Sequence, residues 1–160
     1  MKKIIIGSSG YIGTSLKNFF LKKNEPVITC GRSNCDIKLD LAKNNFKELE
    51  NEISKGDLIY FLAAQSSPDY CENYKSESER INVLNTSNII KKILNKNCRV
   101  VFASTDAVFG DSIDKVYEDS IHMPVGNYGL QKSKVEKIFQ RYDNFQIVRF
   151  SYVVGGDKFT

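Results

Sequence analysis

The sequence predicts an α/β fold, a doubly wound parallel sheet with helices on both faces, from three observations. Short β-branched runs alternate with longer stretches whose apolar residues recur at helical spacing, as in strands joined by crossover helices. The first run has isoleucine at the successive positions 4–6, which suits a strand buried on both faces of a parallel sheet. A glycine-rich turn over 7–13 follows that strand directly and opens the first expected helix.

In the first half of the chain, the apolar pattern predicts three strands and two helices. The opening strand covers 2–6, and the helix after it places apolar residues within 12–20 at i, i+4, i+7 and i+8, so that one face rests on the sheet. A proline introduces the second strand, over 27–30. Three apolar residues within 46–53 mark a short amphipathic helix, and the third strand covers 58–63.

The second half continues the same alternation. A long helix with one apolar face lies within 83–94, and a fourth strand covers 99–103. A further helix spans about 128–142, and the last strand covers 145–150. The sequence has neither an internal repeat nor a linker, so we expect 1–160 to form one domain.

Composition excludes several classes of function. The chain of 160 residues is 41% hydrophobic, which suits one globular domain of ordinary size. Its apolar runs are far shorter than the roughly 20 residues of a membrane-spanning helix. The 23 basic and 19 acidic residues leave a net charge of +4, and the basic residues are spread along the chain. Neither nucleic-acid binding nor membrane attachment is therefore expected.

The cysteines and the N-terminus favour a cytoplasmic protein. The cysteines at 30, 35, 71 and 98 form no CxxC pair, and the single histidine, His122, cannot complete a metal site with them. We expect reduced thiols and no metal. The apolar run at 4–6 is too short for the core of a signal peptide, which needs about seven residues.

The glycine-rich turn is the first candidate site. Gly7, Gly10 and Gly13 follow a strand and open a helix, which is the context of a dinucleotide-binding fingerprint. One glycine permits the tight turn, one lets a pyrophosphate approach backbone N–H groups, and one lets the helix pack closely on the strand. The N-terminus of the helix adds partial positive charge. The alternative is a turn that binds no ligand. The expected cofactor contacts here are Gly7, Ser9, Gly10, Tyr11, Ile12 and Gly13.

The end of the second strand bears on the choice of cofactor. In NAD-binding domains of this type a carboxylate here binds the ribose, but the sequence has Arg32 and Ser33 instead. Arg32 can pair with a 2′-phosphate, which favours NADP(H) over NAD(H), although a solvated surface arginine is the alternative. Asp40 and Leu41 are placed to reach the adenine, or the aspartate simply forms a turn.

A tyrosine and a lysine four residues apart form the candidate catalytic site. Tyr128 and Lys132 share one face of the expected helix, and Thr105 ends the fourth strand. A nearby ammonium is expected to lower the pKa of the tyrosine, so that Tyr128 exchanges a proton with a carbinol or carbonyl oxygen. Thr105 would hold the same oxygen.

With these motifs the sequence resembles the extended short-chain dehydrogenase/reductases. The glycine turn matches the cofactor loop of that family, and Tyr128 with Lys132 matches its catalytic YxxxK motif. The sequence Leu62-Ala63-Ala64 is similar to the strand that passes the cofactor, and Asn82-Val83 to a structural pair in the long helix. The resemblance covers nearly the whole chain and implies a Rossmann domain.

Three further segments resemble the dTDP-4-dehydrorhamnose reductases more narrowly. The sequence over 103–110 is similar to their STDxVF segment, and that over 36–40 to their LDxxD element. Pro124 followed by the sequence over 127–129 is the third. The resemblance implies NAD(P)-dependent reduction of a 4-keto nucleotide sugar in the synthesis of surface-polysaccharide sugars, and a possible homodimer. It also implies that Tyr128 delivers the proton, that Lys132 holds the tyrosine and the nicotinamide ribose, and that Tyr128 and Lys132 thus both contact the cofactor.

Two departures from the family limit this expectation. Gln65 and Ser66 replace the usual aromatic residue and threonine near the nicotinamide and the sugar, which leaves the identity of the substrate open. Family members also run on for another hundred or more residues, so we expect a truncated or partial chain without the C-terminal substrate-binding part.

Two other functions remain open at this stage. One is an NAD-dependent nucleotide-sugar epimerase, which would retain its cofactor. The other is a non-catalytic, cofactor-binding regulatory subunit, although such a subunit would have no need of an intact catalytic set. Dehydration is disfavoured because Thr105 is followed by Asp106-Ala107 and not by Asp-Glu.

Four polar residues are set aside. His122 is interpreted as a solvated loop residue or a turn partner, and Arg149 as structural. The resemblance associates an acidic residue near Glu118 and Asp119 with a metal at a dimer contact, but no metal is predicted here.

Overall fold

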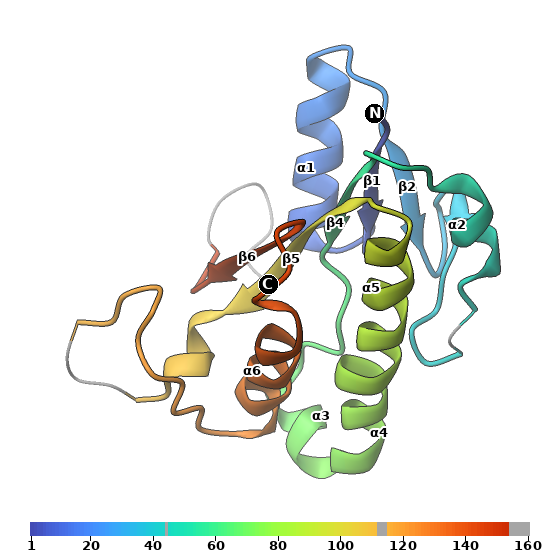
Figure 1. Ribbon diagram of the computed structural model, residues 1–160. Helices are drawn as coiled ribbons and strands as arrows, with labels where there is room; N and C mark the ends of the chain where they lie inside the picture. Colours follow the sequence, from blue (N-terminus) through green and yellow to red (C-terminus); the bar gives the residue numbers. More distant parts are fainter. Residues whose placement is uncertain (44, 112–114, 154–160) are drawn as a thin grey trace.

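The computed structural model describes residues 1–43, 45–111 and 115–153 and contains a six-stranded parallel sheet in the order β3-β2-β1-β4-β5-β6 (Figure 1). The predicted doubly wound α/β fold is confirmed. The strands are β1 (Lys3–Ile6), β2 (Ile28–Gly31), β3 (Ile37–Lys38), β4 (Leu58–Phe61), β5 (Arg99–Thr105) and β6 (Phe145–Phe150). The winding direction reverses between β1 and β4, which opens a crevice at the carboxyl edge of the sheet.

The helices follow from this winding. They are α1 (Tyr11–Lys22), α2 (Lys47–Glu52), α3 (Pro68–Asn73), α4 (Lys75–Glu79), the π-helical segment η1 (Arg80–Asn85), α5 (Thr86–Asn95), the 3₁₀ turn η2 (Asp106–Phe109) and α6 (Asn127–Phe139). Right-handed crossovers put α1 on one face of the sheet and α5 and α6 on the other, where these two pack side by side (Figure 1). In the described part of the chain, no helix is both long and apolar enough to span a membrane.

The structure adds short elements that periodicity could not detect. Strand β3 has two residues, and α3 has six and begins at Pro68, where the hydroxyl of Ser67 accepts a hydrogen bond from Tyr70 N (3.3 Å). The expectation that Phe19 faces the sheet is wrong. Phe20 is buried, but Phe19 is half exposed and lies 4.8 Å beneath the ammonium of Lys23. Residues 154–160, next to which the missing C-terminal part was expected, lie outside the described residues.

The strand-to-helix turn after β1 requires glycine for steric reasons. Gly7 has φ of +92° and donates from its N–H to Cys30 O of β2 (2.8 Å). A Cβ on Gly13 would lie 2.2 Å from Gly7 O, whereas one on Gly10 would lie at an ordinary 3.4 Å. The close approach of α1 to β1 therefore depends on Gly13 and not on Gly10.

This difference predicts unequal effects of alanine at the two positions. We expect Gly13→Ala to lower the free energy of unfolding by about 1–3 kcal/mol, because backbone must move to accept the methyl group. Gly10→Ala is the matched control and should change it by less than about 1 kcal/mol. Urea unfolding of both variants measures the difference, and equal effects would show that the turn is not constrained as described.

Candidate functional site

A cavity of about 720 Å³ lies at the carboxyl edge of the sheet, beside the reversal between β1 and β4. The glycine turn, the ends of β2, β4 and β5, and the start of α6 contribute to its wall. Of the residues predicted for the site, the following line it: Gly7, Ser9, Gly10, Tyr11, Ile12, Gly13, Arg32, Asp40, Leu41, Leu62, Ala63, Ala64, Thr105, Tyr128 and Lys132. Ser33 is exposed and is not part of the wall.

The turn after β1 places the start of α1 at the wall of the cavity. Gly10 is the N-cap of α1, and in the described part of the chain no side chain caps this helix and no acidic residue lies in its first turn. The partial positive charge at the start of this helix is therefore not offset by an acidic residue in its own first turn. A Cβ on Gly7 would lie 2.7 Å from Ala63 N, so the turn also packs directly on the segment after β4.

Asp40, which lines this wall together with Asp106, has a local role as well. Asp40 Oδ1 accepts a hydrogen bond from Ala42 N (3.0 Å), and Asp40 N donates to Asn45 Oδ1 (2.8 Å). The aspartate thus forms a turn, as the alternative interpretation held, while it also lines the cavity. Arg32 is exposed at the mouth of the same cavity.

Tyr128 and Lys132 occupy the first two turns of α6 and face the end of β5. The ammonium of Lys132 is almost fully buried, donates to Ala103 O (2.7 Å), and lies 4.5 Å over the ring of Phe102. It lies 5.8 Å from the centroid of the Tyr128 ring. Thr105 Oγ1 accepts from Ala107 N (3.2 Å), which caps η2 and fixes the hydroxyl at the cavity wall. The three candidate catalytic residues are therefore brought together.

The expectation that Lys132 lowers the pKa of Tyr128 is wrong for this structure. Burial raises the pKa of Tyr128 to about 12. Lys132 donates to a backbone carbonyl and not to the phenol, so its charge does not outweigh the loss of hydration. Burial also lowers the pKa of Lys132 to about 8, although the carboxylate of Glu136 acts in the opposite direction. At neutral pH Tyr128 is therefore a neutral proton donor beside a largely charged lysine.

Asn82 and Gln131 support the site but are absent from the predicted site residues. The side chain of Asn82 accepts from Gln65 N (2.8 Å) and donates to Gln65 O (2.9 Å), which fixes the loop that lines the cavity after β4. Asn82 also donates to the amide oxygen of Gln131 (2.8 Å), and Gln131 Nε2 donates to the hydroxyl of Ser78 (2.8 Å). Gln131 lies one residue before Lys132, so this buried network joins η1 to α6. The only indication of this network in the sequence was the Asn82-Val83 pair, to which the family resemblance assigned a structural role.

The start of α6 depends on an acidic residue from another helix. Gly126, the N-cap, has no side chain, and Glu72 of α3 takes over the capping role. Glu72 Oε1 accepts from Asn127 N (2.5 Å) and Oε2 accepts from Asn127 Nδ2 (2.7 Å), which holds the pKa of Glu72 below its ordinary value. The cap lies one residue before Tyr128. A contact across 55 residues leaves no local pattern in the sequence.

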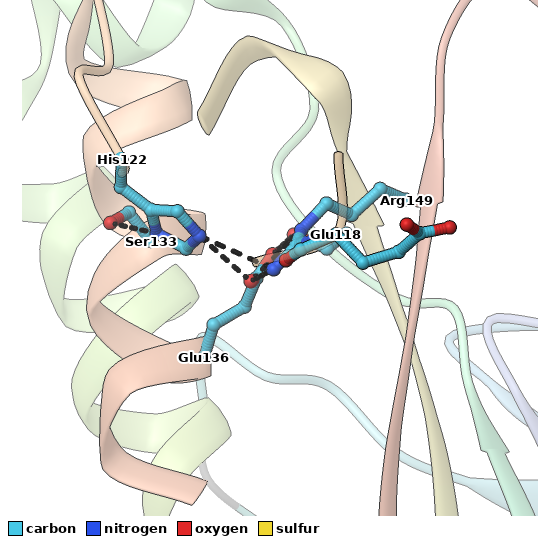
Figure 2. A network of polar contacts seen from close by, with 6 residues as sticks. Glu118, His122, Ser133, Glu136 and Arg149 are labelled. Atoms are coloured by element: carbon cyan, nitrogen blue, oxygen red, sulfur yellow. Dashed lines mark hydrogen bonds and ion pairs between the residues drawn. The ribbon is translucent and has the colours of Figure 1, made fainter. Parts of the chain in front are cut away.

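The interpretation of His122 as a solvated loop residue is wrong. Its side chain is 9% exposed and lies against Ser133 and Glu136 of α6 and Arg149 of β6. Figure 2 shows the ring beside Ser133, with its other side directed toward Glu136 and Arg149. The predicted structural role of Arg149 agrees with this position. Among the described residues, no group of three or more histidine, cysteine or acidic side chains is arranged to hold a metal.

Known proteins are similar to this chain over most of its length. Residues 1–159 match the family model of the RmlD substrate binding domain. Subunit beta of methionine adenosyltransferase 2 from Xenopus laevis is 24% identical over 159 residues, which are 96% of this chain and 47% of that protein. The chain thus spans about half the length of this curated relative.

Solved structures show the same fold. A hypothetical dTDP-4-dehydrorhamnose reductase from Sulfolobus tokodaii has a TM-score of 0.80 and 32% identity, over 94% of this chain and 56% of that one. The dTDP-4-dehydrorhamnose reductase of Bacillus anthracis, in complex with NADP, has a TM-score of 0.79 and 25% identity, over 94% and 54%. MoeE5 in complex with UDP-glucose and NAD shares the fold, with a TM-score of 0.77 and 23% identity over 94% and 53%. The family match over residues 1–159 and the ordered motifs around one cavity lead to one conclusion: the chain belongs to the RmlD substrate binding domain family, among the extended short-chain dehydrogenase/reductases.

Proposed function

We propose that the protein is an NAD(P)-dependent oxidoreductase that reduces the 4-keto group of a nucleotide sugar, and that residues 1–160 are its dinucleotide-binding domain. The observation that carries the proposal is the placement of Thr105, Tyr128 and Lys132 in the wall of the cavity that begins at the glycine turn. The proton donor Tyr128 and the uncapped N-terminus of α1 line this one cavity. This arrangement suits proton transfer coupled to a nicotinamide cofactor.

The residues at the carboxyl edge suit a dinucleotide. The uncapped N-terminus of α1 and the turn at Gly7 would hold the pyrophosphate, and Arg32 would hold a 2′-phosphate. Leu41 and the segment 62–64 would line the adenine and ribose path. When bound, the nicotinamide supplies or accepts the hydride. The B. anthracis reductase with NADP supports this assignment by its similarity.

In the proposed reaction the protein supplies the proton and orients the sugar oxygen that receives it. Tyr128 is neutral at physiological pH and donates its phenolic proton to the developing alkoxide at C4 of the sugar. The ammonium of Lys132 stabilises the phenolate that remains, because it lies one helical turn away on the same side of α6, 5.8 Å from the centroid of the ring. Thr105 donates a hydrogen bond to the same sugar oxygen in place of its contact with Asp106 Oδ1 (3.3 Å), while its hydroxyl still accepts from Ala107 N.

The proposal is tested by turnover of the full-length protein. Incubation with NADPH and dTDP-4-dehydrorhamnose, followed through the absorbance of NADPH, should show continuous cofactor oxidation. Tightly retained cofactor and a sugar that changes configuration without net NADPH consumption would instead identify an epimerase. Neither reaction with any 4-keto nucleotide sugar would contradict the proposal.

A second candidate is a non-catalytic regulatory subunit. The similarity to subunit beta of methionine adenosyltransferase 2 over 96% of the chain favours it. The intact set of Thr105, Tyr128 and Lys132 favours the enzyme instead, because a purely regulatory subunit needs no proton donor. Co-purification with a methionine adenosyltransferase, together with absent turnover, would establish the regulatory role.

The choice of cofactor gives a prediction at Arg32. A guanidinium at the mouth of the cavity can pair with a 2′-phosphate, whereas an aspartate there would repel it and accept the ribose hydroxyls of NADH. We expect wild type to prefer NADPH and Arg32→Asp to lose about 1.5–3 kcal/mol of NADPH affinity, with a smaller loss for NADH.

Arg141→Asp is the control for this change of charge, because Arg141 is exposed and does not line the cavity. Calorimetric titration of both cofactors into the three proteins measures the preference. If the ratio of NADPH affinity to NADH affinity is unchanged in Arg32→Asp, Arg32 is a solvated surface residue and does not bind the 2′-phosphate.

A further inference from the structure

Glu136 is a fully buried carboxylate at the centre of a polar network behind the candidate active site (Figure 2). Arg149 binds it in two places, with Nη2 2.6 Å and Nε 3.1 Å from Oε2. The hydroxyl of Ser104 donates to Oε1, and His122 Nε2 lies 3.5 Å from Oε2. One side chain of α6 thus contacts β5, β6 and the loop that leads to α6.

A second layer of contacts fixes these partners. Arg149 Nη1 donates to Glu118 O (2.9 Å), and Nη2 lies 3.2 Å from His122 Nε2. His122 Nδ1 lies 2.9 Å from Ser133 Oγ. Burial lowers the pKa of His122, so at neutral pH its ring is uncharged and Nε2 can accept from Arg149. The charges that meet here are the carboxylate of Glu136 and the guanidinium of Arg149.

The network is joined directly to the candidate catalytic residues. Ser104 precedes Thr105 on β5 and is the register partner of Arg149 on β6. Glu136 lies one helical turn after Lys132, whose ammonium donates to Ala103 O on the same strand. Helix α6 is therefore attached to the end of β5 at two successive residues, Ala103 and Ser104, immediately before Thr105.

Stability alone does not account for such a network. An apolar group of similar size often stabilises a core as well as a buried ion pair does, because burying both charges costs much hydration. The geometry offers another role. We propose that Glu136 is a positioning residue that fixes α6 against β5 and β6 and thereby places Tyr128 and Lys132 opposite Thr105. Its effect on turnover rests on the proposed function.

The charge of Glu136 adds an effect that a purely structural residue would not have. Lys132 faces Glu136 and Tyr128 on its own helix and Cys71 on α3, and Glu136 faces Arg149 on β6 and His122 in the preceding loop. Glutamine at 136 keeps the shape but leaves the guanidinium of Arg149 uncompensated. Lys132, whose pKa is about 8, should then lose its proton at lower pH than in the wild type.

The first test reads Lys132 directly and needs no turnover. The side-chain signal of Lys132 in the full-length protein is assigned by its loss in Lys132→Met and followed by NMR between pH 6 and 10. We expect Glu136→Gln to lower the midpoint by about one unit or more. Glu79→Gln is the matched control, because Glu79 of α4 pairs with Lys134 of α6 (2.6 Å) at a more exposed position. An unchanged midpoint in Glu136→Gln would overturn the charge effect.

The second test removes the β5 contact without unbalancing the charges, and it also serves if Glu136→Gln does not fold. Ser104→Ala should lower kcat about tenfold or more with KM for NADPH unchanged, since small misplacements of reacting groups are costly. Wild-type kcat in this variant would overturn the positioning role. Absence of turnover in the wild type would instead contradict the proposed function, while the titration of Lys132 would still test the network.

Discussion

Replacing Tyr128 by phenylalanine is expected to lower turnover of the full-length protein by about 10²- to 10⁴-fold, because the substitution removes only the proton donor. Burial holds the pKa of Tyr128 at about 12, so the phenol is protonated throughout the neutral range. The phenyl ring of phenylalanine fills the same space as that of tyrosine, and the glycine turn and Arg32, which are proposed to hold the cofactor phosphates, are unaffected. Affinity for NADPH should therefore remain nearly unchanged.

Tyr142→Phe is the control for this substitution. Tyr142 lies just beyond α6, is 44% exposed and does not line the cavity, so the loss of its hydroxyl should leave turnover unchanged. Steady-state kinetics and calorimetric titration of both variants separate chemistry from binding. Near wild-type turnover in Tyr128→Phe would show that another group delivers the proton.

Replacing Lys132 by methionine is expected to lower turnover about 10²- to 10³-fold while it stabilises the fold at neutral pH. The ammonium supports the phenolate of Tyr128 in the proposed reaction, and methionine cannot. Yet burial lowers the pKa of Lys132 from 10.5 to about 8, which means that the folded protein carries this charge at a cost. Removing the charge should raise the free energy of unfolding by about 1–3 kcal/mol at pH 7.

The pH dependence gives the sign of this effect. The unfolded chain keeps the proton of Lys132 up to its ordinary pKa, whereas the folded chain releases it near pH 8. The cost is therefore fully present below about pH 8 and disappears as the pH rises to about 10.5, so wild type should approach the stability of Lys132→Met over that range. Urea unfolding at several pH values measures this. A variant that is less stable than wild type at pH 7 would contradict the account.

Local chemistry explains which parts of the fold were predictable. The isoleucines of β1, the glycine turn and the apolar spacing of α6 each act within one element, so the sequence shows them directly. The last strand was predicted over the residues that β6 occupies. Strand β3 and helix α3 were not predicted, because segments of two and six residues are too short to show a periodic pattern of apolar residues.

The supporting residues of the site were not predictable for a different reason. The contacts of Glu136 with Ser104, of Glu72 with Asn127 and of Asn82 with Gln131 join residues that are 32, 55 and 49 positions apart. Sequence spacing does not reveal which distant polar groups become partners. The pKa of Tyr128 was misjudged on the same ground, since the extent of burial follows from tertiary packing.

The most direct test of the central claim is the fate of a label on the cofactor. The full-length protein is incubated with dTDP-4-dehydrorhamnose and NADPH that carries deuterium at the transferable position of the nicotinamide, and the product is analysed by mass spectrometry and NMR. The account predicts a reduced sugar with deuterium at C4, formed together with an equal amount of NADP⁺, and almost no product with Tyr128→Phe. A product without deuterium, or a sugar that is not reduced at all, would contradict it.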